Sequence, residues 1–192
     1  MINYMNVAQI STGFIEIPGR VSLNIYVQGC EKRCPGCQNP ELQSFDGSKG
    51  ILSVNDIDSL LTMYPLCDSV CWLGGDAVYQ PVAFKELNKE FTKRGLVVCL
   101  YTGKLFDEIQ DLIDDVDIII DGEWNGIPVT KSDSRYMGEP GTTNQRILIR
   151  RLDNSMWEQL DWCTFNCVAS YHKKINELKR KVGYLDAPTA VI

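Results

Sequence analysis

The chain has 192 residues, of which 44% are hydrophobic, and its formal net charge is −6 at pH 7. A chain of this length can bury one substantial core, so we expect a single domain over residues 1–192, with a core at 20–151 and a C-terminal extension at 152–192. The acidic balance argues against binding to nucleic acid, and no apolar run is long enough to cross a membrane. Because the first residues also lack a signal-peptide pattern, we expect a cytoplasmic protein.

Short apolar runs alternate with helical patterns from Asn24 onward. The runs cover residues 24–27, 69–73, 96–101, 117–120 and 147–149. Such alternation is typical of βαβ units. The sequence therefore predicts an α/β fold with a mostly parallel sheet.

Three helices are expected between these runs. The first follows a capping box in which Ser53 and Asp56 occupy the first and fourth positions. The second begins near Pro81 and ends at Gly95, and the third carries an apolar stripe over residues 105–116.

The remaining segments have weaker patterns. Residues 122–143 are rich in Gly, Pro, Ser and Thr, which predicts a long loop. Residues 171–182 have helical spacing and five basic side chains, so they form either a solvated helix face or a docking surface for an acidic partner.

The stretch GCEKRCPGCQNP places Cys30, Cys34 and Cys37 directly after the first apolar run. In a chain without an export signal, clustered cysteines are more often metal ligands than disulfides. A structural zinc site normally requires four protein ligands, for which Cys163, Cys167 or His172 could supply the fourth. Three thiolates on an iron–sulfur cube would instead leave one iron open to a substrate or cofactor. The other thiols, Cys67, Cys71 and Cys99, are most simply core residues.

A second candidate feature, Gly74-Gly75-Asp76, follows the next apolar run. It is either an ordinary turn or a ligand site, because two glycines let the backbone approach a ligand, and carbonyls with a carboxylate suit a cationic amino group. In open α/β sheets, ligands bind beyond the carboxyl ends of the strands. The glycines and the cysteines are therefore expected at one cavity.

The pattern C-x-x-x-C-x-x-C, followed by GGD after the second strand, resembles the radical S-adenosylmethionine enzymes. Further stretches, VQGCEKRCPGCQNP, YTGK (101–104), IIIDGEW (118–124) and GTTNQRILI (141–149), resemble the anaerobic ribonucleoside-triphosphate reductase activating proteins. The resemblance spans residues 24–150 in consistent order, which is more specific than a single motif.

This resemblance implies a partial, open (β/α) barrel that binds a 4Fe-4S cluster and S-adenosylmethionine. By the resemblance, Cys30, Cys34 and Cys37 would hold the cluster. The implied cofactor-binding positions are Gly74, Gly75, Asp76, Thr102, Gly103 and Asp121, of which the first three would receive the amino group of S-adenosylmethionine.

The implied activity is reductive cleavage of S-adenosylmethionine, which generates a glycyl radical on the large subunit of an anaerobic ribonucleoside-triphosphate reductase. A flavodoxin-like protein or another low-potential donor would supply the electron. No catalytic acid–base side chain is required, because the cofactors carry the radical chemistry. Two alternatives stay open: a radical S-adenosylmethionine enzyme that acts on a small molecule, as carboxy-deazaguanine synthase does, and a non-catalytic zinc-binding module.

Overall fold

The computed structural model describes residues 3–126, 142, 144–151, 155–160 and 165. The predicted C-terminal helix with His172, the pair Cys163 and Cys167, and most of the predicted loop over 122–143 lie outside the described residues.

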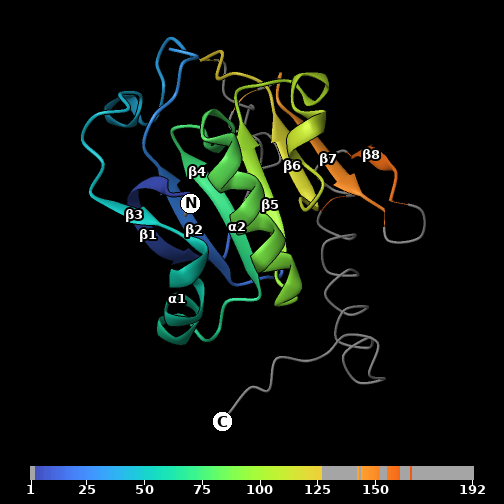
Figure 1. The fold of residues 1–192 in the computed structure, drawn as a ribbon. Helices are drawn as coiled ribbons and strands as arrows, with labels where there is room; N and C mark the ends of the chain where they lie inside the picture. The colour runs from blue at the N-terminus through green and yellow to red at the C-terminus, as the bar shows by residue number, and fades with distance from the viewer. Residues whose placement is uncertain (1–2, 127–141, 143, 152–154, 161–164, 166–192) are drawn as a thin grey trace.

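The described residues form one mixed sheet of eight strands in the order β3-β1-β2-β4-β5-β6-β7-β8 (Figure 1). The strands are β1 (Met5–Gly13), β2 (Ser22–Val27), β3 (Gly50–Leu52), β4 (Ser69–Gly74), β5 (Val97–Thr102), β6 (Ile118–Asp121), β7 (Arg146–Arg150) and β8 (Trp157–Leu160). Since β3 and β8 stand at opposite ends of this order, the sheet is open. The predicted open α/β fold is confirmed.

Parallel pairing is confined to the four central strands, β2, β4, β5 and β6. The expectation of a mostly parallel sheet was therefore too broad, because the outer strands pair antiparallel. The connections β1–β2 and β7–β8 are short, and a parallel pair needs a crossover of about a dozen residues or more.

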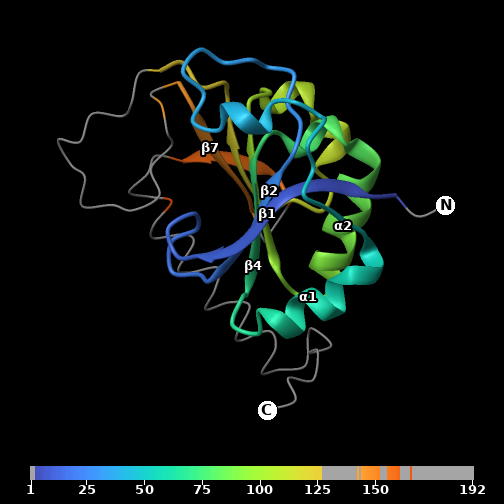
Figure 2. The ribbon, with the colours of Figure 1, turned by 90° about the vertical axis from the view of Figure 1, so that its left-hand side faces the viewer.

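Two helices cover one face of the sheet, as Figures 1 and 2 show. The first, α1 (Ile57–Met63), follows a short 3-10 turn, η2 (Val54–Asp56), and the predicted capping box of Ser53 and Asp56 is present at that turn. The second, α2 (Pro81–Lys93), has a proline in its first turn, as predicted. The longest described helix has 13 residues, and none of the described helices is long and apolar enough to cross a membrane.

The prediction of a third α-helix over 105–116 is wrong. The segment forms two 3-10 turns, η4 (Phe106–Glu108) and η5 (Gln110–Leu112). Of the predicted stripe, Ile109, Ile113 and Val116 are buried, but Leu105 is exposed. The segment is also rich in aspartate, a poor helix former. The side chains of Lys85 and Thr92 in α2 also donate hydrogen bonds to main-chain carbonyls of this segment. The segment is therefore held against α2 although it does not form an α-helix.

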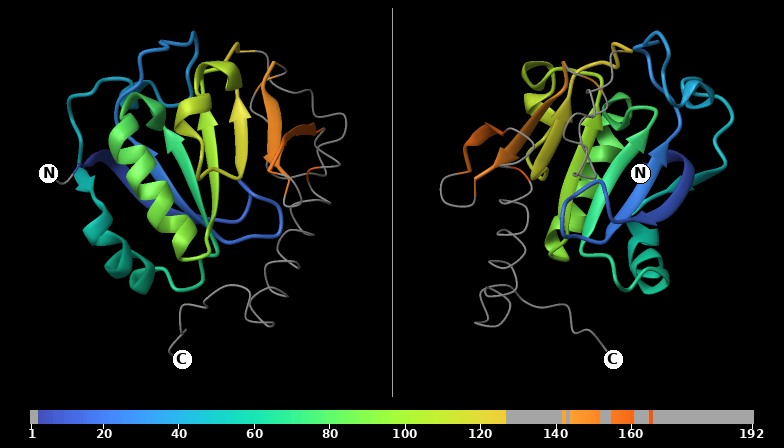
Figure 3. Two further views of the ribbon diagram at one scale, coloured as in Figure 1. Left: turned by 45° about the vertical axis from the view of Figure 1, so that its right-hand side comes forward. Right: turned by 180° about the vertical axis from the view of Figure 1, so that it is seen from behind.

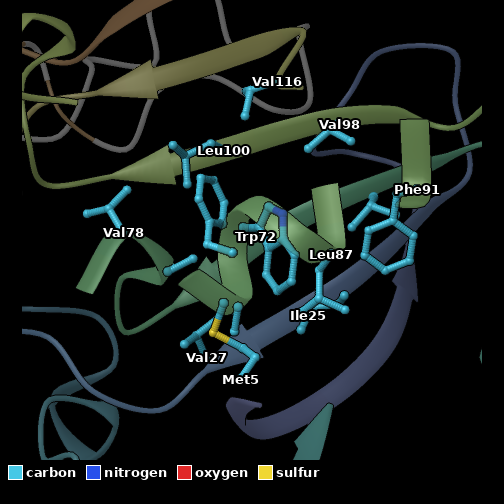
Figure 4. Close-up of a cluster of buried hydrophobic side chains, with 14 of the residues drawn as sticks. Met5, Ile25, Val27, Trp72, Val78, Leu87, Phe91, Val98, Leu100 and Val116 are labelled. Carbon is cyan, nitrogen blue, oxygen red and sulfur yellow. The ribbon is translucent and has the colours of Figure 1, made fainter. Parts of the chain in front are cut away.

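Hydrophobic side chains pack on both faces of the sheet. Under the helices, Trp72 lies near Phe91 (Figure 4) and also packs against Phe84. Its indole N–H donates to Asn88 Oδ1 at 2.7 Å. The other face buries a second cluster, which includes the predicted core thiols Cys71 and Cys99. Both faces are therefore filled, and the carboxyl ends of the central strands remain available for a site.

Candidate functional site

An open cleft lies where the central strands end, and its empty space of about 740 Å³ includes part of the open solvent. In Figure 3 the loop after β2 lies at the end of the sheet to which β4, β5 and β6 point. The lining residues are Cys30, Lys32, Cys34, Cys37, Gln38, Asn39, Gln43, Leu73, Gly74, Gly75, Tyr101, Thr102, Gly103, Gly122, Trp124 and Gln145. The three predicted cluster cysteines and four of the six predicted cofactor-binding residues thus line one cavity. Asp76 and Asp121 do not line it.

The cysteine loop is held by the segment 39–45, which runs back beside it. The main-chain N–H of Gly29 donates to Leu42 O at 2.8 Å, and that of Cys30 donates to Gln43 O at 3.0 Å. The side-chain amide of Gln28 donates to Ser44 O at 2.5 Å. Sequence reasoning missed this segment, because its contacts are made by the main chain.

The three thiols lie close enough to affect one another. Burial raises the pKa of the Cys30 thiol, and the charges of Asp76, Cys34 and Cys37 raise it further, whereas a hydrogen bond from the main-chain N–H of Lys32 lowers it. The Cys37 N–H donates to Cys34 O at 3.2 Å, which closes the predicted tight turn at Pro35 and Gly36. All three cysteines are half-buried, and none of them forms a disulfide.

A cluster and a single metal ion place different demands on these thiols. In the described part of the chain, no three His, Cys, Asp or Glu side chains gather closely enough to hold one metal ion. A cube places each thiolate on a different iron, so the three sulfurs do not need to meet at one point. The zinc alternative invokes a fourth ligand from residues 163, 167 or 172, which lie outside the described residues.

The glycine pair brings the end of β4 against the cysteine loop. The N–H groups of Gly75 and Asp76 donate to Val27 O and Gly29 O, each at 2.8 Å. A Cβ atom at Gly75 would lie 2.4 Å from Gly29 O, so only glycine allows this approach. Gly74 has a φ of +92°, which also favours glycine.

Asp76 points away from the cleft, and its side chain is 1% exposed. Its Oδ2 accepts hydrogen bonds from Thr102 Oγ1 at 2.8 Å and from Gly103 N at 2.9 Å. Burial raises the pKa of this carboxyl to about 6, although these hydrogen bonds oppose the rise. The carboxylate thus fixes the positions of Thr102 and Gly103, which themselves line the cleft. The predicted contact between Asp76 and an amino group stays a prediction.

Asp121 is also fully buried. Its Oδ1 accepts from Arg146 Nε at 2.9 Å, its Oδ2 pairs with Arg146 Nη2, and its Oδ2 accepts from Phe106 N at 2.7 Å. The predicted contact between Asp121 and a cofactor likewise stays a prediction. Its neighbour in the motif, Gly122, does line the cleft, and its carbonyl accepts from Gln145 Nε2 at 3.1 Å.

Several lining residues were not selected from the sequence as site residues. Trp124 lies beside the cysteine turn, with its Nε1 3.8 Å from the position of a Cβ at Gly36. Tyr101 reaches the cleft from β5 and donates to Glu16 O at 3.2 Å. The motif YTGK could have indicated Tyr101, and IIIDGEW could have indicated Trp124, since both motifs end a strand.

Comparison with known proteins identifies the class. The family described as "4Fe-4S single cluster domain" matches residues 18–148, which is more than half of the chain. The pyruvate formate-lyase-activating enzyme of Clostridium pasteurianum is 24% identical over 115 residues, covering 57% of this chain and 48% of that protein. Among solved structures, QueE from Escherichia coli has a TM-score of 0.45 and 15% identity, with 52% of each chain covered.

The chain belongs to the 4Fe-4S single cluster domain family. Its similarity to an activating enzyme agrees with the sequence motifs. The predicted cofactors, a 4Fe-4S cluster and S-adenosylmethionine, agree with this family and this similarity. The chain spans about half the length of the activating enzyme that it matches.

Proposed function

We propose that this chain is an activase that generates a glycyl radical on the large subunit of an anaerobic ribonucleoside-triphosphate reductase. One observation carries the proposal: all four stretches that resemble the activating proteins contribute to the same cleft. They supply the three cysteines, the Tyr101–Thr102–Gly103 turn, the pair Gly122 and Trp124, and Gln145.

In this proposal, Cys30, Cys34 and Cys37 hold the cluster and leave one iron without a protein ligand. The cluster and S-adenosylmethionine, when bound, supply the one-electron chemistry of the reaction. The chain supplies the geometry. The main chain at Gly74 and Gly75 and the turn at Thr102 and Gly103 form a wall beside the cysteine loop, where the amino acid part of S-adenosylmethionine would bind.

The partner and the electron donor follow from the same proposal. An open cleft lined by amide side chains suits a peptide segment, because amides can pair with a main chain without burying charge. The similarity to a pyruvate formate-lyase-activating enzyme supports a protein substrate of the glycyl-radical class. A flavodoxin-like or other low-potential protein would deliver the electron.

The first experiment is anaerobic reconstitution with iron and sulfide, followed by measurement of S-adenosylmethionine cleavage under a strong reductant. We expect methionine and deoxyadenosine from the wild type and from Cys67→Ala, because Cys67 is half-buried and does not line the cleft. We expect none from Cys34→Ala. Uptake of zinc without acid-labile sulfide in the wild type would favour the zinc-binding module and overturn the proposal.

The second experiment addresses the partner. The reconstituted chain is mixed with the anaerobic reductase of the same source, and glycyl radical formation is followed by electron paramagnetic resonance. A radical on the reductase that requires Cys34 supports the activase. Cleavage of S-adenosylmethionine without any radical on the reductase would instead favour a small-molecule substrate.

A further inference from the structure

The charge of the cleft is unusual for an acidic protein. Among the described residues that line it, Lys32 is the one side chain with a formal charge apart from the thiols. No carboxylate lines it, and the other polar side chains are hydroxyls and the amides of Gln38, Asn39, Gln43 and Gln145. The net charge of −6 is therefore carried elsewhere on the chain.

The position of Lys32 is set by contacts of its main chain and of its side-chain stem. Its main-chain N–H lies near enough to the Cys30 thiol to lower the pKa of that thiol, which places the backbone beside a cluster cysteine. Its aliphatic stem crosses Gly103, where a Cβ atom would lie 3.0 Å from Lys32 Cγ. Gly103 is itself held by its hydrogen bond to the buried Asp76. The half-buried Lys32 is thus positioned between the cysteine loop and the end of β5.

The neighbouring cations are placed differently. Lys104 Nζ lies 3.3 Å from Glu108 Oε1 and 5.5 Å from the centre of the Tyr79 ring, so its charge is already paired. A main-chain hydrogen bond lowers the pKa of the Glu108 carboxyl most, and the charge of Lys32 also helps to lower it, but it contributes less than Lys104 does. Arg33 is exposed, and its Nη1 reaches Gln43 Oε1 at 3.5 Å. Neither side chain lines the cleft.

We propose that Lys32 is a positioning residue that favours the reduced state of the cluster. The inference rests on the proposed function, because it requires a cluster at Cys30, Cys34 and Cys37. Three thiolates make the site negative, and reduction adds one more electron. The ammonium group of Lys32, which lines the same cleft as the three thiols, stabilises the added charge more than neutral amides do, and the half-buried position of the residue limits screening by salt. Net charge and hydrogen bonds to the sulfurs are among the factors that set the potential of such clusters.

The test is a redox titration of the reconstituted cluster without S-adenosylmethionine, followed by electron paramagnetic resonance. Lys32→Met keeps the stem that packs on Gly103 and removes the charge. We expect the ratio of reduced to oxidised cluster at a fixed potential to fall roughly tenfold, which corresponds to ~59 mV for one electron. Lys32→Arg should stay within about threefold of the wild type. Arg33→Met, which removes a cation one residue away, should also stay within about threefold because that side chain is exposed.

Each outcome separates the inference from the function on which it rests. An unchanged ratio in Lys32→Met overturns the inference, and so does an equal fall in Arg33→Met, which would indicate a general charge effect. Weaker binding of S-adenosylmethionine to Lys32→Met without a change in the ratio would also overturn it, because Lys32 would then be a ligand-binding residue. A wild type that assembles no cluster would contradict the proposed function itself.

Discussion

The ends of β4 and β6 both have a glycine next to a buried aspartate, but the contacts of these residues differ between the two strand ends. At the end of β4, Gly75 lies against the main chain of the cysteine loop, and Asp76 accepts hydrogen bonds from neutral groups only. At the end of β6, Gly122 has room for a methyl group, and Asp121 pairs with Arg146.

The difference shows what each strand end stabilises. The end of β4 holds the loop that carries the cysteines, through main-chain contacts that no side chain can replace. The end of β6 adds an ion pair to the backbone pairing of β6 with β7, and one substitution can remove that ion pair. We therefore expect substitutions at β4 to affect the cleft most, and those at β6 to affect the stability of the sheet.

The largest effect is expected for Gly75→Ala. The added methyl group would lie 2.4 Å from Gly29 O and 2.8 Å from Val27 O, so backbone atoms must move. We expect a loss of about 4 kcal/mol in the free energy of unfolding, above the ~1–3 kcal/mol typical of overpacking, and failure of cluster assembly. Urea unfolding and the iron content after reconstitution measure both effects.

Gly122→Ala is the matched control. Its nearest neighbour would be Asn144 O at 3.4 Å, so the substitution is penalised mainly by the φ of +107°. A cost of about 2 kcal/mol with normal iron content is expected. Equal effects of the two substitutions would contradict the difference between the two strand ends.

An intermediate effect is expected for Arg146→Met. This change leaves the carboxylate of Asp121, which is fully buried, without its cation. Removing one partner of a buried pair costs ~3–5 kcal/mol, and because 35% of the Arg146 side chain is exposed we expect about 3 kcal/mol by urea unfolding. Arg151→Met removes an arginine that faces Glu158 in a pair where both side chains are about half exposed, so its cost should stay below about 1 kcal/mol. Similar costs would mean that Asp121 does not depend on its partner.

Much of this framework could be predicted from local pattern. The five predicted strands and the capped first helix depend on residues close together in the chain, such as Ser53 and Asp56. The strand β1 was missed because its register shifts between Val7 and Gln9, which breaks the alternation of buried and exposed residues. The segment 105–116 was assigned to a helix because an apolar stripe does not distinguish an α-helix from successive 3-10 turns.

The cleft was predicted in outline but not in its supporting contacts. The cysteines and the glycine pair follow strands, so their meeting at one end of the sheet followed from topology. The inward orientation of Asp76 depends on Thr102 and Gly103, which lie 26 and 27 residues along the chain. No local pattern records such a contact, and a GGD turn is equally compatible with a carboxylate that faces a ligand.

The smallest effect, and the one that tests Asp76 directly, is expected for Thr102→Val. The folded-state pKa of Asp76 is about 6, above its ordinary value of 3.8, so the folded protein binds this proton more tightly than the unfolded chain does. Its contribution to stability is therefore present at low pH and is lost as the pH rises from about 4 through 6. The Thr102 hydroxyl stabilises the charged form, so its removal should raise this pKa further and extend the loss to higher pH.

We expect Thr102→Val to cost about 1.5–2 kcal/mol more at pH 7.5 than at pH 4.5, which is the lower part of the ~1.5–3 kcal/mol usual for a hydrogen bond to a charged group. Urea unfolding at the two pH values gives this difference, and the other titrating groups cancel because they are shared with the wild type. Thr62→Val serves as the control, since the hydroxyl of Thr62 donates to a main-chain carbonyl, Asp58 O, at 2.8 Å on an exposed helix. Its cost should not depend on pH. If the cost of Thr102→Val is also independent of pH, Asp76 is not charged at neutral pH. The hydrogen bond from Gly103, the residue on which Lys32 packs, would then go to a protonated carboxyl group.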